Sequence, residues 1–308
     1  MVRLVDELRR ERNTSNNGTL YSVSQVLFAY NSNRIEGLQL SQDQTNQIWQ
    51  TGAVTTQNQT PLPVDDIAET TNHFRAFDWV LDHADDELTD SMICHIQGLI
   101  KCNTSLAHNS PDQIGHYKTV NNFIWRGEVF EPVATAPVSR VHQLMDRYVH
   151  MVATLADNPV QIAGSHWLFE RIHPFVDGNG RTGRLLLFKE CLHLDTIPPL
   201  ILNQNRRAYM NGLENFPDQP GYLVDTLLSA RDGYQQLMSA LIPPSVHVDF
   251  SYNDVWNEQD ESLQSFRRWN REFHSFPDPL SDQLEKAIFP KKTNRKKPQQ
   301  KPHQKPDD

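Results

Sequence analysis

One short segment of the 308-residue chain combines the residue types that phosphate chemistry needs. From His173 to Arg184 it reads His-Pro-Phe-Val-Asp-Gly-Asn-Gly-Arg-Thr-Gly-Arg. Glycines at 178 and 180 can adopt positive φ, so that successive backbone N–H groups converge on an anion. A helix that begins at this loop would direct its N-terminal dipole to the same place. We therefore expect the loop to hold the phosphates of a nucleoside triphosphate.

The charged side chains of the same segment could complete such a site. Arg181 and Arg184 are three residues apart, share one helix face and could reach the outer phosphates. Asp177 offers the hard oxygen ligands that suit a Mg²⁺ ion bridging phosphates. His173, with an ordinary pKa near 6.5, could take a proton from an attacking hydroxyl. Each residue alone would also fit an ordinary structural role. The hypothesis therefore rests on the fixed spacing of the whole set.

At these residues the chain resembles the Fic family, whose motif HxFx(D/E)GNGRxxR is matched at every specified position. The resemblance extends to His166–Ile172 before the motif and covers roughly residues 20–240. It implies a mainly α fold, a Fic-type helical bundle with a short β-hairpin flap. It also implies a protein adenylyltransferase, a nucleotidyltransferase that moves AMP from ATP to a Ser, Thr or Tyr hydroxyl of a target protein. The target is unknown, and self-modification is a reasonable first signal.

The resemblance assigns a role to each motif residue. It makes His173 the general base, Asp177 the Mg²⁺ ligand, Gly178, Asn179 and Gly180 the anion hole, and Arg181 and Arg184 the residues that orient the β- and γ-phosphates. The hydroxyl would attack the α-phosphorus in line, and pyrophosphate would leave. The hairpin would place an extended target segment by strand addition.

A second motif resembles the family's inhibitory sequence, (S/T)xxxE(G/N). Here it is Ser32-Asn-Arg-Ile-Glu36-Gly37, before the catalytic segment, as in the Fic class with an N-terminal inhibitory helix. Glu36 would pair with Arg184 and prevent productive ATP binding. Some family members with this glutamate also remove AMP, so a de-AMPylating or bifunctional enzyme is an alternative. The alternative without a function is that Glu36 is a helix-end glutamate exposed to solvent.

Three positions depart from the family pattern. The family often has two tyrosines near the adenine, whereas Arg206–Leu213 contains only Tyr209, which either packs on the base or is an ordinary core tyrosine. Lys118 replaces the usual arginine of the flap, and Asn122 stands at its usual apolar strand position. The family's mode of binding its target therefore cannot be assigned directly to this chain.

The periodicity of apolar residues and the positions of capping residues, Gly and Pro predict the elements that must position this site. We expect helices over about 20–37, 65–82, 87–100, 138–156, 158–173 and 181–193, a further helix opened by a capping box at Ser41–Gln44, and a hairpin over 117–130. Four regions follow. They are an N-terminal helical region with the inhibitory helix (1–110), a Fic catalytic core with the flap (111–240), a C-terminal extension with short helices (241–289), and a disordered Lys/Pro-rich tail (290–308).

Composition excludes several classes of protein. The formal net charge of -9 argues against a general nucleic-acid binder, which needs surplus Lys and Arg. Three cysteines without a CxxC pair predict neither a disulfide framework nor a thiolate zinc site, and favour a cytoplasmic location. No apolar stretch resembles a signal core or approaches the roughly 20 residues of a membrane span. The sequence leaves open whether the chain forms a homodimer.

Two further classes compete with a transferase. Glu170-x-x-His173 and Glu190-x-x-His193 have the ExxH spacing of di-iron helix bundles, but Pro174 directly after the first pair spoils the continuous helix that such a site needs. A catalytically silent nucleotide-binding module on the Fic scaffold is the other class. The complete motif argues against it, because a protein that had lost the activity would be expected to have lost His173 or Arg184.

Overall fold

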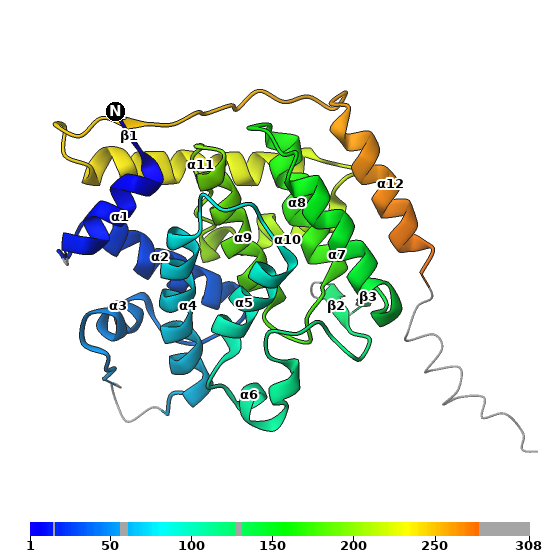
Figure 1. The fold of residues 1–308 in the computed structure, drawn as a ribbon, viewed down its shortest axis with the longest axis horizontal. Coiled ribbons are helices and arrows are strands. Elements are labelled where there is room, and N and C mark those ends of the chain that lie inside the picture. The colour runs from blue at the N-terminus through cyan, green and yellow to red at the C-terminus, as the bar shows by residue number, and fades with distance from the viewer. Residues whose placement is uncertain (15, 56–60, 127–130, 277–308) are drawn as a thin grey trace, which may run out of the picture. The chain divides into compact units, whose positions relative to one another are not determined.

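The motif spans the junction of two consecutive helices at the centre of the fold (Figure 1). The computed structural model describes residues 1–14, 16–55, 61–126 and 131–276. Helix α8 (Pro159–Ile172) begins as predicted at Asn158, whose side chain accepts the N–H groups of Val160 and Gln161. Helix α9 (Asn179–His193) begins two residues before the predicted Arg181, because Gly178, at a φ of 81°, already turns the chain into the helix.

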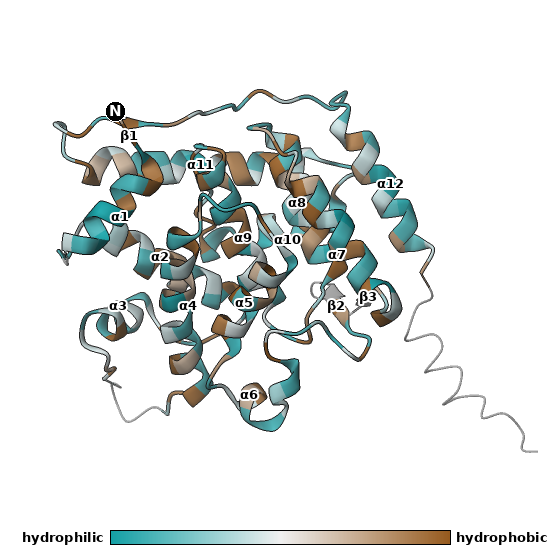
Figure 2. Cartoon of the chain, viewed as in Figure 1, coloured by the Kyte–Doolittle hydropathy of each residue, from teal (hydrophilic) through white to brown (hydrophobic). Residues whose placement is uncertain are grey.

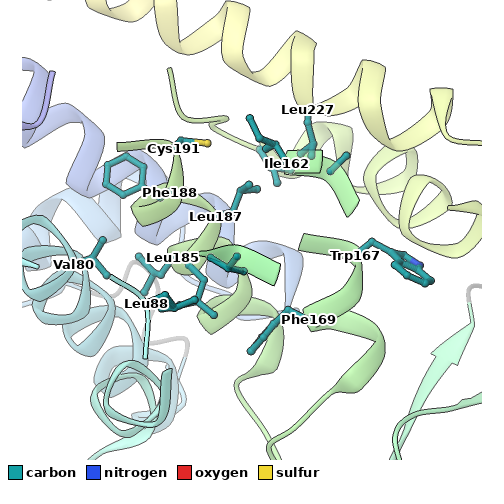
Figure 3. Close-up of a cluster of buried hydrophobic side chains, with 14 of the residues drawn as sticks. Val80, Leu88, Ile162, Trp167, Phe169, Leu185, Leu187, Phe188, Cys191 and Leu227 are labelled. Atoms are coloured by element: carbon teal, nitrogen blue, oxygen red, sulfur yellow. The ribbon is translucent and has the colours of Figure 1, made fainter. Parts of the chain in front are cut away.

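Helix α9 is surrounded by other helices. It packs against α2 (Leu20–Ile35), α4 (Val64–Asp82), α5 (Asp90–Lys101) and α8. Almost all its side chains are buried, as expected of a helix with neighbours on every side. Figure 3 shows Leu185 and Phe188 of α9 among apolar side chains of α4, α8 and α11. The motif segment is therefore anchored to a well-packed helix.

Most predicted helices are present with shifted ends. The capping box at Ser41 is formed and opens α3 (Gln42–Thr51), and the helix predicted over 138–156 is α7, which ends at Val152. Helix α7 spans Val138–Val152. The other helical elements among the described residues are α1 (Leu4–Thr14), α6 (Ser105–Asn109), α10 (Arg206–Asn215), α11 (Gly221–Leu241), α12 (Ser262–His274) and the 3₁₀ turns Pro111–Gln113 and Asn203–Asn205. The prediction of a mainly α fold with a short hairpin is confirmed.

The hairpin consists of β2 (Phe123–Arg126) and β3 (Glu131–Ala134), which pair antiparallel with Phe123 opposite Ala134. The prediction placed its first strand too early, at Tyr117. Instead, Asn122 donates its side-chain Nδ2 to the carbonyl of Phe175, and Lys118 donates its backbone N–H to the carbonyl of Pro174. The turn at 127–130 lies outside the described residues.

The residues predicted to form a C-terminal extension pack, as far as Phe276, against the helices that precede them. Met1–Phe276 make one compact unit. Strand β4 (Val248–Asp249) pairs in parallel with β1 (Val2–Arg3), and α12 lies against α8. The α12 surface visible in Figure 2 is mostly polar, whereas its buried face carries Leu263, Phe266, Trp269 and Phe273. Short helices were predicted here, but not this docking. The tail predicted over 290–308 lies outside the described residues.

Among the described residues, no helix combines the length and the apolar character that crossing a membrane requires.

Candidate active site

The turn between α8 and α9 is held by the side chain of Asn179. Its Nδ2 donates to the carbonyl of Phe175 at 2.8 Å, and its Oδ1 accepts the N–H of Phe175 at 2.9 Å. Gly178 caps α9 without a side-chain hydrogen bond, so no cap side chain accepts the first N–H groups of the helix. Asn179 thus holds the loop from inside, so a contact of residues 178–180 with an anion would have to come from their backbone N–H groups.

His173 lies at the end of α8 with a left-handed backbone, at a φ of 51°. Its Nδ1 is 3.2 Å from the carbonyl oxygen of Glu170. Because a carbonyl can only accept, Nδ1 carries the proton and Nε2 keeps its lone pair. Burial and the nearby charge of Lys118 lower the pKa of His173 to about 4. The imidazole is therefore neutral at physiological pH, the form that a general base requires.

Arg184 is 6% exposed, and its Nη2 and Nε contact the end of α2 and the residue that follows it. Its Nη2 lies 2.7 Å from Oε1 of Glu36 and 3.0 Å from the carbonyl of Ser32, and its Nε donates to Oγ of Ser32 at 2.9 Å. The two halves of the predicted inhibitory motif thus contact the same guanidinium. Sequence analysis named both residues, and the structure brings them together.

The end of α2 is fixed so that Glu36 must face the loop. Gly37 turns the chain at a φ of 97°, and Nε of Arg206 donates to the carbonyl of Ile35 at 2.9 Å. Burial alone would raise the pKa of Glu36, but the charges of Arg184 and Arg181 outweigh it and hold the pKa below its ordinary value. The carboxylate is therefore ionised in its pair with Arg184.

The other motif charges form a network with two residues that sequence analysis missed. Glu69 of α4 bonds both Nζ of Lys101, in α5, and Nη1 of Arg181. Lys101 also donates to Oδ2 of Asp177 at 2.5 Å, while Nη2 of Arg181 lies 3.8 Å from Oδ1 of Asp177. Except for the pair of Arg181 and Asp177, these contacts join residues 32 to 112 positions apart, and no local pattern marks them. Arg181 is buried beside the loop rather than extended into solvent.

A Mg²⁺ ion fits Asp177 only together with a nucleotide. The side chain of Asp177 is 51% exposed and already attracts a cation, the Lys101 ammonium. Among the described residues, no cluster of three or more His, Cys, Asp or Glu side chains could hold a metal. One carboxylate plus substrate phosphates is, however, a common way in which proteins bind Mg²⁺. No such cluster in this part of the chain supports the di-iron alternative either.

Tyr209 is completely buried, and its hydroxyl lies 2.7 Å from Nε2 of His166. In this conformation its ring is not open to a base from solvent. The geometry corresponds to the alternative of a core tyrosine, and packing of Tyr209 on adenine stays a prediction.

The two flap departures lie in contact. Nζ of Lys118 donates to Oδ1 of Asn122 at 2.5 Å and to Oγ1 of Thr135 at 2.8 Å. Nδ2 of Asn122 in turn donates to the carbonyl of Phe175 at 2.8 Å. Burial lowers the pKa of Lys118 to about 7. A lysine and an asparagine thus link the base of the hairpin to the catalytic loop.

Glu170 is a further acidic residue at the site. Its Oε1 is buried and has no hydrogen-bond partner within the described part of the chain. Burial raises its pKa to about 8, against the opposing charge of Arg184. The carboxyl is therefore mostly protonated at neutral pH and does not compete with Glu36 for Arg184. The sequence signals only its ExxH spacing, which suggests a different role.

Comparison with known proteins identifies a family for this region. Residues 87–190 match the model of the Fic/DOC family. The protein adenylyltransferase fic-1 of Caenorhabditis elegans is 29% identical over 225 residues, 68% of this chain and 40% of that protein. The protein adenylyltransferase Fic of Drosophila ananassae is 26% identical over 145 residues, 46% of this chain and 29% of that protein. The chain thus spans less than half the length of these relatives.

Solved structures share the fold. A Fic-domain-containing signalling protein from Bacteroides thetaiotaomicron superposes with a TM-score of 0.58 at 22% identity, covering 77% of this chain and 87% of that one. Fic-1 from C. elegans gives a TM-score of 0.57 at 21% identity, covering 77% of this chain and 70% of that one.

Proposed function

Since this chain is a Fic-family protein, we propose that it transfers AMP from ATP to a hydroxyl side chain of a target protein, and that Glu36 inhibits the transfer. Relatives named protein adenylyltransferase support this activity at the level of the family. The observation that carries the proposal is the complete motif around one loop, with a neutral His173 on one side and Arg184 on the other.

The chemistry follows from the proton positions in the site. Nε2 of His173 takes the proton of the target hydroxyl while that oxygen attacks the α-phosphorus and the bond to pyrophosphate breaks. The carbonyl of Glu170 holds the ring in the tautomer that leaves Nε2 free. The N-terminal amides of α9 stabilise the charge on the phosphates. When bound, Mg²⁺ would be held by Asp177 and neutralise the phosphate oxygens.

Inhibition is a competition for Arg184. While Glu36 and Ser32 occupy its donors, Arg184 cannot bind the γ-phosphate, so that ATP is held without its triphosphate in line. A charge-assisted carboxylate–guanidinium pair is strong enough to do this. Removal of the carboxylate frees Arg184, whose position remains fixed by α9.

The test uses the full chain with labelled ATP, cell lysate and mass spectrometry. We expect Glu36→Gly to add a mass of one AMP to a protein, including this chain itself, and Glu36→Gly with His173→Ala to add none. ATP binding without any transfer by the Glu36→Gly protein would instead favour the silent nucleotide-binding module. A modified target returned to the wild-type protein would reveal AMP removal, the bifunctional alternative.

A further inference from the structure

The carboxylate of Asp177, which the proposed function assigns to Mg²⁺, is paired with a lysine in the free protein. Nζ of Lys101 lies 2.5 Å from its Oδ2. The lysine side chain is only 4% exposed, whereas that of Asp177 is 51% exposed. The ammonium therefore approaches Asp177 from inside the protein, and a metal would approach from the solvent side.

The position of Lys101 is fixed by the loop it supports. A Cβ at Gly178 would lie 3.1 Å from Cγ of Lys101, so the loop packs directly on the lysine stem. One turn earlier in α5, Nε2 of Gln97 donates to the carbonyl of Asp177 at 3.1 Å. Oε1 of Gln97 accepts the N–H of Gly115 at 2.6 Å. The end of α5 thus holds both the loop backbone and a cation beside the Asp177 carboxylate.

Glu69 gives this cation a second partner. One oxygen of Glu69 bonds Lys101 and the other bonds Arg181, and both Glu69 and Lys101 are buried. If Asp177 turned to another cation, the Lys101 ammonium would keep its bond to Glu69 and would not be left unpaired in the interior. The cost of breaking the Lys101–Asp177 pair is therefore small compared with that of stranding a buried charge.

We propose that Lys101 is a built-in competitor for the divalent cation. It neutralises Asp177 in the free protein and gives the carboxylate up when Mg²⁺ arrives with the nucleotide, remaining bonded to Glu69. Two cations at one carboxylate repel each other, so the metal alone binds weakly and the phosphates must contribute to its binding. This inference rests on the proposed function for the identity of the metal ligand, and makes Lys101 and Glu69 positioning residues.

The test measures Mn²⁺ binding without nucleotide, by the loss of the free-ion signal in electron paramagnetic resonance. We expect Lys101→Met to strengthen Mn²⁺ binding about fivefold or more, since it removes a competing ion pair. Glu69→Gln should change affinity in the opposite direction, because Lys101 then has Asp177 as its remaining carboxylate partner in this network. Adding Asp177→Asn to Lys101→Met should abolish the gain.

A lysine that only supports the loop would give the reverse result. Lys101→Met would then weaken Mn²⁺ binding or leave it unchanged, and either outcome overturns the inference. So does a gain that survives Asp177→Asn. Helical circular dichroism and the melting temperature identify a variant that fails to fold, and in that case the Glu69→Gln result decides. The readout needs no AMP transfer, so an inactive Glu36→Gly protein would refute the proposed function and not this competition.

Discussion

The carboxylate of Glu36 occupies the space in which a side chain at Gly180 would begin. A Cβ at position 180 would lie 2.2 Å from Oε1 of Glu36 and 3.0 Å from Nη1 of Arg184. The absence of a side chain at Gly180 thus allows one carboxylate to approach both the loop and the arginine. Under the proposed function, phosphates that approach the loop backbone would need the same space, so the glutamate and the nucleotide would compete for it.

In the proposed inhibition, the hydroxyl of Ser32 should contribute through its bond to Arg184. Ser32→Ala removes the 2.9 Å bond to Nε of Arg184 and leaves the Glu36 contact in place. One hydrogen bond to a charged group contributes about 1 kcal/mol or more, so we expect AMP transfer to rise roughly fivefold. The activity should lie between those of the wild type and Glu36→Gly in the labelled-ATP assay.

Ser24→Ala is the matched control for Ser32→Ala. Ser24 is also buried in α2, but its hydroxyl bonds the hydroxyl of Tyr234 at 2.8 Å rather than Arg184. It should leave AMP transfer at the wild-type rate. Equal activation by both variants would mean that loosening α2, not freeing Arg184, releases the enzyme.

The pH dependence of transfer should report His173. With its pKa lowered to about 4, the base is neutral from about pH 5 upward, so the acid limb of the Glu36→Gly rate should lie well below the ordinary value near 6.5. The charge of Lys118 contributes to this shift, so Lys118→Met should move the limb toward higher pH. An acid limb that stays in place in Lys118→Met would show that Lys118 has no influence on His173.

Glu170 should make stability depend on pH. Its pKa is near 4.5 in the unfolded chain and about 8 in the fold, so the folded protein binds more protons between these values. Its contribution to stability is complete below about pH 4.5 and is lost as the pH rises through 8. Glu170→Gln, which mimics the protonated form, should therefore melt progressively higher than the wild type between pH 5 and pH 8. A difference in melting temperature that is constant with pH would contradict the raised pKa.

The sequence allowed the motif and its local structure to be predicted, because both depend on neighbouring residues. Asn158 and Ser41 cap helices through bonds to amides two or three positions away. The pair of Glu36 and Arg184 was predictable only through the family resemblance, since 148 positions separate the partners. Glu69 and Lys101 have no local signal of any kind, and only the packing of α4 and α5 against α9 brings them to Asp177.

Two departures of the flap from the family pattern are linked in the structure. Considered singly, Lys118 and Asn122 each make it harder to assign the family's mode of target binding to this chain. In the fold they share a hydrogen bond, and Asn122 continues to the carbonyl of Phe175. Sequence periodicity placed a strand across both residues because it does not account for such side-chain bonds.

Packing of α12 against α8 should depend on the absence of a side chain at one glycine of α8. A Cβ at Gly164 in α8 would lie 2.2 Å from the ring of Phe266 in α12, so Gly164→Ala must displace the ring or the helix. We expect a loss of about 1–3 kcal/mol in the free energy of unfolding by urea, as for other overpacked sites. Gly233→Ala in α11 is the control, since nothing lies within 4 Å of its added Cβ, and it should stabilise by up to about 1 kcal/mol. If Gly164→Ala stabilises equally, the extension does not pack on α8 in solution.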